Sequence, residues 1–249
     1  MKTTKKASEM TARELAKYID QSVLKPEFSE AEIRKYIQEG IDYGCATVCV
    51  NPALLDIAAE MTKGTDTKIC VVCDFPFGLS TTESKVAQAE AYCKRGDIFE
   101  LDMVANYGLI RSRKWEEAEK DIKEVVDVCH KYGTTVKVIL ETDALTREEI
   151  IRGTKIVVAS GADYVKSSTG FLTGTECVGA TVEVVQIMMD AAEGKIKVKG
   201  SGGIRTREHF LKLIDMGIDR MGVGYKSTPL VLKTNDGEVN RSSVQGGSY

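Results

Sequence analysis

Short apolar segments alternate with amphipathic segments along almost the whole of this sequence. Expected strands cover residues 19–24, 46–52, 68–76, 98–106, 135–142, 163–169, 196–202 and 219–224. Expected helices, with apolar residues at spacings of three and four and a closing glycine, cover residues 29–44, 81–96, 114–133, 146–161, 180–194 and 206–217. Alternation of this kind is typical of parallel βαβ units, so the chain is an α/β protein with a parallel sheet.

Eight strands within 249 residues fit a single (β/α)8 TIM barrel, a fold of about 250 residues. The competing fold is an open doubly wound sheet, which usually carries a G-x-G-x-x-G turn after its first strand, and the sequence has none there. We therefore expect one barrel domain with an N-terminal helix over residues 1–232. The polar, aperiodic residues 233–249 are expected to form a flexible tail.

Composition excludes several classes of function. A net charge of −3 and 6% aromatic residues argue against a nucleic-acid partner. No apolar run reaches the ~18 residues of a membrane span, and the first residues do not form a secretory signal, so no membrane partner is expected. Seven cysteines, mostly in apolar segments, indicate reduced thiols and a cytoplasmic protein. The pair Cys70 and Cys73 stands alone, which favours buried thiols over a zinc or redox site.

Histidine is scarce, and this limits the available chemistry. His130 and His209 both lie in expected helices, away from the glycine-rich strand ends. Serine hydrolases and most metal-assisted lyases need positioned imidazoles. Any catalysis is therefore expected to rest on lysines and carboxylates.

Polar side chains stand at the ends of four successive expected strands. These are Asp102, Glu141, Lys166 and Lys199. In a barrel the active site lies at the carboxyl ends of the strands, so these groups should converge.

Strand alternation gives the direction of several lysines. It places Lys197 and Lys199 on one face of their strand, toward the barrel interior, and Lys137 behaves similarly.

Two lysines and an aspartate in a barrel mouth can together carry out nucleophilic catalysis on a carbonyl compound. An amine attacks a carbonyl only when neutral, and the pKa of a free lysine is about 10.4. A neighbouring cation and partial burial both lower that value. The iminium that forms is an electron sink for carbon–carbon cleavage, and a carboxylate can move the protons. The alternative is a structural network of ion pairs inside the barrel.

A glycine-rich turn follows the seventh expected strand. Gly202 and Gly203 leave backbone N–H groups uncovered, and Thr206 can cap the next helix. Such a helix start favours an anion, typically phosphate. The alternative is an ordinary flexible turn.

Four motifs, in order, resemble the deoxyribose-phosphate aldolases, class I (Schiff-base) aldolases on a (β/α)8 barrel. They are ELDMVANYG, VKVILET, ADYVKSSTGF followed by GAT, and VKGSGGIRT, within a similarity that spans roughly residues 12–225. The resemblance implies that Lys166 forms the Schiff base with acetaldehyde. It also implies that Lys199 tunes the proton affinity of that amine and that Asp102 transfers protons.

The resemblance also suggests binding residues. Thr169 would lie near the substrate, Gly202 and Gly203 would contact its phosphate, and Gly222 of the last strand would complete that site. Cys49 matches a family cysteine near the aldehyde pocket, and a plain strand thiol is an equally good interpretation.

Two departures from the family pattern leave the phosphorylated substrate open. LTGTECV lengthens one loop near the mouth, and Gly224 and Tyr225 stand where the family usually has serines. Lys226 could hold phosphate there as a point charge, or it could be a solvated loop residue. Tyr249 could reach back to the active site, as in some family members, or be idle.

The expected reaction is the reversible cleavage of 2-deoxy-D-ribose 5-phosphate to D-glyceraldehyde 3-phosphate and acetaldehyde, with neither a metal nor an organic cofactor. One alternative is a related Schiff-base aldolase for another sugar, and another is a non-catalytic barrel that binds sugar phosphates. Sugar phosphate and aldehyde are the expected small-molecule partners, and a homo-oligomer, either dimer or tetramer, is expected.

Overall fold

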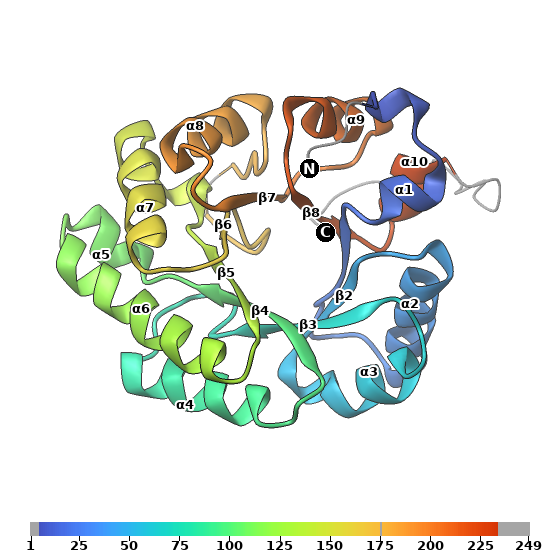
Figure 1. Cartoon of the computed structure of the whole chain (residues 1–249), viewed down its shortest axis with the longest axis horizontal. Helices are drawn as coiled ribbons and strands as arrows, with labels where there is room; N and C mark the ends of the chain where they lie inside the picture. Colours follow the sequence, from blue (N-terminus) through green and yellow to red (C-terminus); the bar gives the residue numbers. More distant parts are fainter. Residues whose placement is uncertain (1–4, 175, 234–249) are drawn as a thin grey trace.

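A closed barrel of eight parallel strands forms the centre of the computed structural model, which describes residues 5–174 and 176–233. The strands are β1 (Ile19–Val23), β2 (Thr47–Val50), β3 (Lys68–Cys73), β4 (Ile98–Val104), β5 (Thr135–Ile139), β6 (Tyr164–Lys166), β7 (Lys197–Ser201) and β8 (Arg220–Gly224). They neighbour one another in chain order, and β1 pairs with β8 to close the ring (Figure 1). The expected TIM barrel is confirmed.

Helices surround the strands as an outer layer (Figure 1). They are α1 (Ala12–Ala16), α2 (Glu30–Tyr43), α3 (Leu55–Thr62), α4 (Thr82–Cys93), α5 (Tyr107–Arg111), α6 (Trp115–Lys131), α7 (Arg147–Ala159), α8 (Val182–Ala192), α9 (Arg207–Met216) and α10 (Thr228–Leu232). Short 3-10 turns are η1 (Ala7–Glu9), η2 (Pro52–Leu54) and η3 (Thr142–Ala144). The six helices named from the sequence all form. The pattern missed α3, α5 and α10, because each is too short to repeat an apolar spacing.

Local capping chemistry fixes where the helices begin and end. Ser29 and Thr146 form capping boxes with the third residue of α2 and α7 respectively. Gly44 and Gly217 end α2 and α9 in the left-handed conformation that glycine adopts without strain. The chain therefore returns to the barrel at defined points, which sets the register of the strands that follow.

The strands separate an apolar outer core from a polar barrel interior. On β5, Val136 and Val138 belong to the hydrophobic core that the strands share with the helices. Lys137 lies between them, is fully buried, and contacts Asp102 inside the barrel. The barrel interior is therefore partly filled by charged side chains, which must be paired to be stable there.

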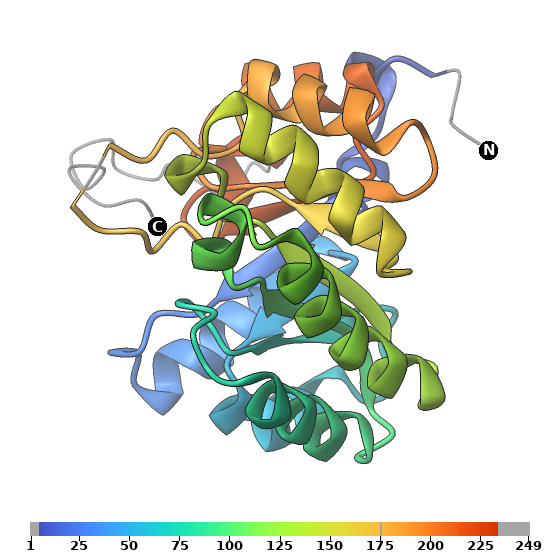
Figure 2. The same ribbon diagram turned by 90° about the vertical axis from the view of Figure 1, so that its left-hand side faces the viewer.

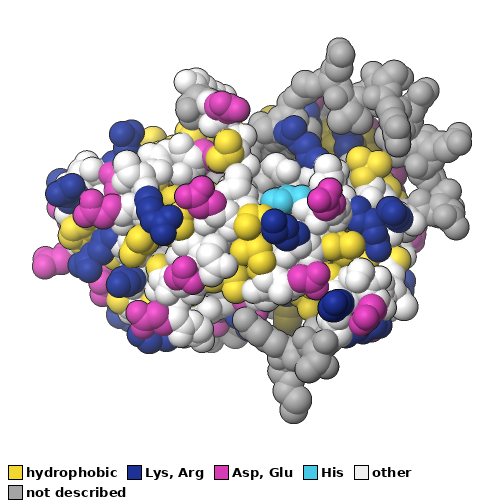
Figure 3. All heavy atoms as spheres, turned by 90° about the horizontal axis from the view of Figure 1, so that it is seen from above, with side chains coloured by type: hydrophobic (Ala, Val, Ile, Leu, Met, Phe, Trp, Pro, Cys, Tyr) yellow, Lys and Arg dark blue, Asp and Glu magenta, His cyan; other side chains and the backbone are white. Residues whose placement is uncertain are grey.

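The two ends of the barrel differ in their connections. Figure 2 shows the long connection between β6 and α8 projecting beyond the barrel on the left, at the end where the strands finish. On the face seen in Figure 3, Lys and Arg side chains are interspersed with Asp and Glu side chains and small hydrophobic patches. Within residues 5–174 and 176–233, none of the helices has the length and apolar character needed to cross a membrane.

Candidate active site

The carboxylate of Asp102, on β4, contacts three lysines inside the barrel. Its Oδ2 accepts from Lys166 Nζ at 2.8 Å and from Lys199 Nζ at 2.7 Å. Its Oδ1 accepts from Lys137 Nζ at 2.8 Å. All four side chains are buried. The structure thus brings together the three residues that the sequence singled out for catalysis.

Strand register explains this convergence. Lys166 is the last residue of β6 and pairs in register with Lys199 of the neighbouring β7. On the other side of β6, Lys166 is in register with Ile139 of β5, and Asp102 is in register with Lys137 of the same strand. Side chains from in-register residues of parallel strands point to the same side, so the ammonium groups meet around one carboxylate.

A second set of buried charges lies beneath the first, and sequence reasoning missed it. Lys199 Nζ lies 2.5 Å from Asp20 on β1, and Arg220 on β8 lies 2.6 Å from the same residue. Arg220 also contacts Glu100 at 3.1 Å, and Lys137 lies 2.5 Å from Glu100. Glu100 stands two residues before Asp102, so strand alternation places both on one face and offered a usable signal for Glu100.

Cations outnumber carboxylates in this network. Lys137, Lys166, Lys199 and Arg220 face Asp20, Glu100 and Asp102. In the described part of the chain, Lys166 forms an ion pair with Asp102 alone, whereas Lys137 and Lys199 each pair with at least two carboxylates. Lys166 is therefore the lysine of this network with the fewest ion-pair partners.

Burial and ion pairing fix the charges of the partners of Lys166. Burial alone would raise the pKa of Asp102, but the ammonium groups of Lys137, Lys166 and Lys199 hold it well below its usual value. Burial alone would lower the pKa of Lys199, but Asp102 and Asp20 raise it above its usual value. Asp102 is therefore an anion at neutral pH, and Lys199 is a fixed cation that shares its oxygen with Lys166.

An apolar wall borders the charged groups. Cys49 on β2 and Cys70 on β3 are in register and form a buried cluster with Leu24 and Val72. The rings of two further residues, Phe75 and Phe171, pack against this cluster with their centroids 5.2 Å apart.

Cys70 Sγ donates to Asp102 Oδ1 at 3.2 Å. Cys49, the strand neighbour of Cys70, is therefore linked to the charged groups through Cys70. Cys73 instead belongs to the outer core, which places the two members of the C-x-x-C pair on opposite faces of β3.

Thr169 and Glu141 are bound to each other beside Lys166. Thr169 is fully buried, its backbone N–H donates to Glu141 Oε1 at 3.2 Å, and its hydroxyl donates to Glu141 Oε2. The sequence indicated Glu141 only as a polar strand end and gave it no function. Its partner could not be read from the pattern, because Thr169 lies in the connection after the neighbouring strand.

The glycines expected to bind phosphate meet at one small cavity. It has a volume of about 30 Å³ and is lined by Gly202, Gly203, Ile204, Arg205, Gly222, Gly224 and Ser227. Gly202 and Gly203 have φ values of 87° and 72°, a conformation that strains other residues. A Cβ on Gly222 would lie 2.5 Å from Ser201 Oγ, so the close approach of β7 and β8 requires glycine there.

The residues that depart from the family pattern take different places. Lys226 is exposed, is not among the described residues that line this cavity, and has its Nζ 5.8 Å from the ring centroid of Tyr225. Tyr225 packs on Tyr36 with ring centroids 3.8 Å apart and on Phe28 at 5.3 Å. Ser227 is the hydroxyl residue of this loop that lines the cavity. Tyr249 lies outside the described residues.

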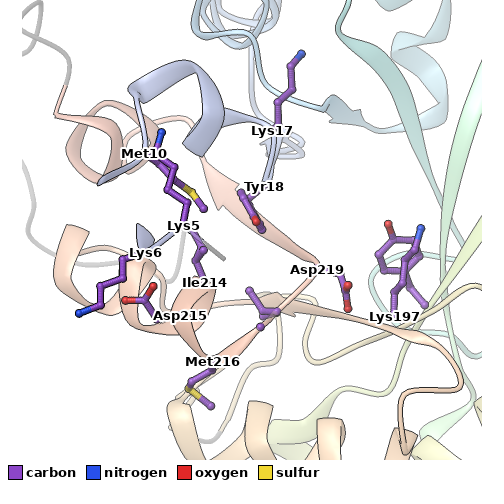
Figure 4. A pocket seen from close by; sticks show the side chains of 13 residues that line it. Lys5, Lys6, Met10, Lys17, Tyr18, Lys197, Ile214, Asp215, Met216 and Asp219 are labelled. Carbon is purple, nitrogen blue, oxygen red and sulfur yellow. The ribbon is translucent and has the colours of Figure 1, made fainter. Parts of the chain in front are cut away.

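A larger cavity lies at the opposite end of the barrel. It has a volume of about 930 Å³, and Lys6, Lys17 and Lys197 are among the residues that line it. Figure 4 shows the side chains of Lys6 and Lys17 pointing away from each other. Lys197 shares a strand face with Lys199, but it is the first residue of β7, so it is exposed and lies over the ring of Tyr164 at 5.1 Å. Lys197 thus lies on the interior face, as expected, but at the solvent-exposed end of the barrel, away from the buried position of Lys199.

Sequence comparison shows that this chain is similar to known aldolases. A family model described as DeoC/LacD family aldolase matches residues 14–227. A deoxyribose-phosphate aldolase of Thermoanaerobacter sp. (strain X514) is 44% identical over 209 residues, which cover 84% of this chain and 92% of that protein. One from Thermococcus kodakarensis is 43% identical over 215 residues, with coverage of 86% and 94%.

Solved structures of aldolases also superpose on this chain. The deoxyribose phosphate aldolase of Aeropyrum pernix, described as having a unique tetrameric structure, superposes with a TM-score of 0.79 at 28% identity and covers 90% of this chain and 91% of that one. Another solved aldolase has a TM-score of 0.78 at 35% identity, with coverage of 88% and 95%.

Proposed function

We propose a specific reaction for this chain, which belongs to the DeoC/LacD family of aldolases and, within it, to the deoxyribose-phosphate aldolases. The reaction is the reversible cleavage of 2-deoxy-D-ribose 5-phosphate to D-glyceraldehyde 3-phosphate and acetaldehyde. The observation that carries the proposal is the single carboxylate of Asp102 shared by Lys166 and Lys199 in a buried barrel mouth.

Lys166 is the proposed nucleophile. Its neutral amine attacks the aldehyde carbon of the open-chain sugar, and loss of water gives the iminium. The bond between C2 and C3 then breaks, its electrons move toward the iminium to form an enamine, and the C3 hydroxyl loses its proton as it becomes the new aldehyde. Protonation of the enamine and hydrolysis release acetaldehyde and restore the amine.

The neighbours of Lys166 support these steps. Asp102, held as an anion, is within hydrogen-bond reach of Lys166 and can transfer protons to and from water and the intermediates. Lys199 keeps a positive charge beside the same oxygen, which disfavours a second ammonium and so favours the neutral form of Lys166. The apolar wall with Cys49, Phe75 and Phe171 suits the two-carbon fragment that stays attached.

The glycine-lined cavity is the proposed phosphate site. Backbone N–H groups near Gly202 and Gly203, together with the Ser227 hydroxyl, can hydrogen-bond an anion there. The role of Lys226 as an additional point charge remains a prediction, since its ammonium lies near Tyr225 at the outside of this loop.

One observation favours a second candidate, an aldolase of the same mechanism that takes a different sugar. Tyr225 turns into an aromatic cluster with Tyr36 and Phe28, so this loop position offers no side-chain hydroxyl to the cavity among the described residues. The two candidates differ in their preference for phosphate. We expect kcat/KM to be higher for deoxyribose 5-phosphate than for deoxyribose, and equal values would favour the second candidate.

We also propose that the chain assembles as a dimer or tetramer. The Aeropyrum pernix aldolase is described as tetrameric, and Phe77 and Leu79, in the connection after β3, are 63% and 65% exposed. Light scattering on the purified protein would measure the mass directly. A monomer at micromolar concentration would refute this part of the proposal.

Trapping of the covalent intermediate tests the mechanism. The protein would be incubated with acetaldehyde, reduced with borohydride, digested and mapped by mass spectrometry. We expect a two-carbon adduct on Lys166. An adduct found only on Lys137 or Lys199 would overturn the assignment of the nucleophile, and no adduct on any lysine would overturn the Schiff-base mechanism.

A further inference from the structure

Glu141 is a buried acid in the barrel mouth to which the proposed reaction gives no task. Strand alternation on β5 points Lys137 and Ile139 into the barrel, and Glu141 follows at the same spacing. Backbone hydrogen bonds from Leu140 N to Lys166 O (3.0 Å) and from Thr142 N to Ser167 O (3.1 Å) enclose it. Glu141 therefore stands directly beside the strand end that carries Lys166.

The backbone at Glu141 is strained. Its φ is 57°, in the left-handed region that residues other than glycine rarely adopt. Strain of this kind persists only where surrounding contacts enforce it, and it concentrates at functional sites. Here the conformation turns the chain into the 3-10 turn η3 while the carboxylate stays directed at Thr169.

The hydroxyl of Thr169 is almost fully engaged. It donates its proton to Glu141 Oε2 and accepts from the backbone N–H of Phe171 at 3.0 Å. The backbone N–H of Thr169 also donates to the same carboxylate, at 3.2 Å to Oε1. A hydroxyl has one proton and two acceptor sites, so the described contacts leave one acceptor site and no proton.

The charge on Glu141 is influenced from several sides. The pKa of Glu141 is raised above its usual value, because the effects of burial and Asp143 outweigh the opposing effects of the two Thr169 hydrogen bonds and Lys166. Tyr107 and Cys177 also lie close enough to experience its charge. The backbone N–H and the hydroxyl of Thr169 each need an acceptor on Glu141. The two carboxylate oxygens, Oε1 and Oε2, are these acceptors.

We propose that Glu141 is a positioning residue that acts through Thr169: its carboxylate makes the Thr169 hydroxyl an obligate hydrogen-bond acceptor for a hydroxyl group of the sugar. This inference rests on the proposed function, because it requires a sugar in the mouth beside Lys166. Thr169 is the group that touches the substrate, and Glu141 sets its polarity. A site of this kind selects a substrate that presents a hydroxyl and penalises one that lacks it.

Replacement of Glu141 by glutamine reverses that polarity at nearly constant shape. The amide has one acceptor oxygen, which can serve the backbone N–H of Thr169. Its NH2 group then faces the Thr169 hydroxyl and donates to it. With Phe171 N–H as the other donor, both acceptor sites are filled, and Thr169 can only donate to the substrate.

Two assays separate this role from the Schiff-base chemistry. The first follows exchange of the methyl protons of acetaldehyde in D2O, which needs the Schiff base and no sugar hydroxyl. The second follows cleavage of deoxyribose 5-phosphate. We expect Glu141→Gln to lower kcat/KM for cleavage about 10- to 100-fold, the scale of one charge-assisted hydrogen bond. Exchange should stay within about twofold of wild type, because that half-reaction does not use Thr169.

A double-mutant cycle tests whether Glu141 acts through Thr169. Thr169→Val should lower cleavage by a similar factor, and Glu141→Gln in that background should add little. Thr169→Ser, which keeps the hydroxyl, should retain most of the activity. The matched control is Glu148→Gln, a glutamate whose side chain is 83% exposed on α7, and it should behave as wild type in both assays.

The outcomes are distinguishable. Independent, additive losses in the double variant would overturn the proposal, and so would an equal loss of exchange and cleavage in Glu141→Gln, which would indicate a purely structural role. Absence of acetaldehyde exchange in the wild-type protein would instead overturn the proposed Schiff-base function, whatever Glu141 does. Thermal unfolding of each variant shows whether a loss reflects an unfolded protein.

Discussion

Both ends of the barrel carry lysines, and the two groups could hardly differ more. At the carboxyl ends of the strands, Lys166 and Lys199 are buried and share one oxygen of Asp102. At the other end, Lys6, Lys17 and Lys197 are exposed around a cavity of about 930 Å³. Nearby carboxylates are already engaged there, since Asp215 and Asp219 accept backbone N–H groups. The larger hollow therefore lacks the convergence of charges that catalysis needs.

The difference between the two ends follows from the cost of burying charge. An ammonium in the interior costs several kcal/mol unless it is paired, so the interior lysines can exist only as members of a network. A solvated lysine has no such requirement and can point in any direction. Removal of a charge should therefore have large effects at one end of the barrel and almost none at the other.

The largest effect is expected for Lys166→Arg. A guanidinium stays protonated and cannot attack a carbonyl, so the rate of sugar cleavage should fall by about 10⁴-fold or more, the scale for loss of a catalytic nucleophile. The measurement is the steady-state rate of aldehyde release. Lys197→Arg is the control with the same chemical change, and significant turnover by Lys166→Arg would contradict the assignment.

Asp102→Asn should come next. The amide cannot transfer protons as the carboxylate does, so kcat should fall by about 10²-fold or more while KM changes much less. Three ammonium groups would also lose their shared partner, which should cost about 3–5 kcal/mol in the free energy of unfolding. Kinetics and denaturant titration measure the two effects, and an unchanged kcat would remove Asp102 from the mechanism.

The interior carboxylates should also make the free energy of unfolding depend on pH in the acid range. Burial would raise the pKa of Asp20, but Arg220, Lys199 and Lys137 hold it well below its usual value. A lowered pKa in the folded state contributes stability that is complete above about pH 4, the unfolded value, and that is lost as the pH falls below it. Denaturant midpoints measured from pH 7 to pH 3 should fall for wild type and fall less for Asp20→Asn. Parallel curves would argue against this account.

A smaller effect is expected for Lys199→Leu. Without the fixed cation beside Asp102, a neutral amine is harder to form at Lys166, so the pH at which activity appears should rise. The ascending limb of the pH–rate profile measures this shift. If it coincides with that of wild type, Lys199 does not tune the nucleophile.

The smallest effect is expected at the other end, for Lys197→Met. This side chain is exposed, so the free energy of unfolding should change by no more than about 0.5 kcal/mol and kcat should not change. A loss of activity comparable to that of Lys199→Leu would break the contrast between the two ends.

The sequence predicted the barrel and its central trio because both depend on local patterns. Apolar runs located the strands and closing glycines located the helix ends. The positions of Asp102, Lys166 and Lys199 at strand ends, together with the family motifs, identified these three residues. The sequence did not predict the ion pair of Asp20 and Arg220, because this pair depends on the contact between the first and last strands. For Lys197, alternation gave the face of the strand but not the depth along the barrel, and the residue lies at the exposed end.

The helix layer shows the same limit. Lys85 on α4 is completely buried, with its Nζ 2.7 Å from Asp121 on α6. In the sequence it has the appearance of a solvated helix lysine, because its partner lies on a later helix. Glu141 was recognised as a strand-end acid, but its link to Thr169 depends on how two adjacent strands end. Local patterns thus located the residues, and only the packed structure revealed their partners.

Closure of the ring between β1 and β8 has a consequence for the order in which the protein assembles. Asp20 and Arg220 are separated by 200 residues, and their ion pair forms only when the last strand docks beside the first. Contacts between such distant residues carry a large loop-closure cost. A nascent chain that lacks β8 would leave Asp20 without its guanidinium partner. The charge balance around Lys199, which shares Asp20 with Arg220, is therefore complete only when the final strand is in place.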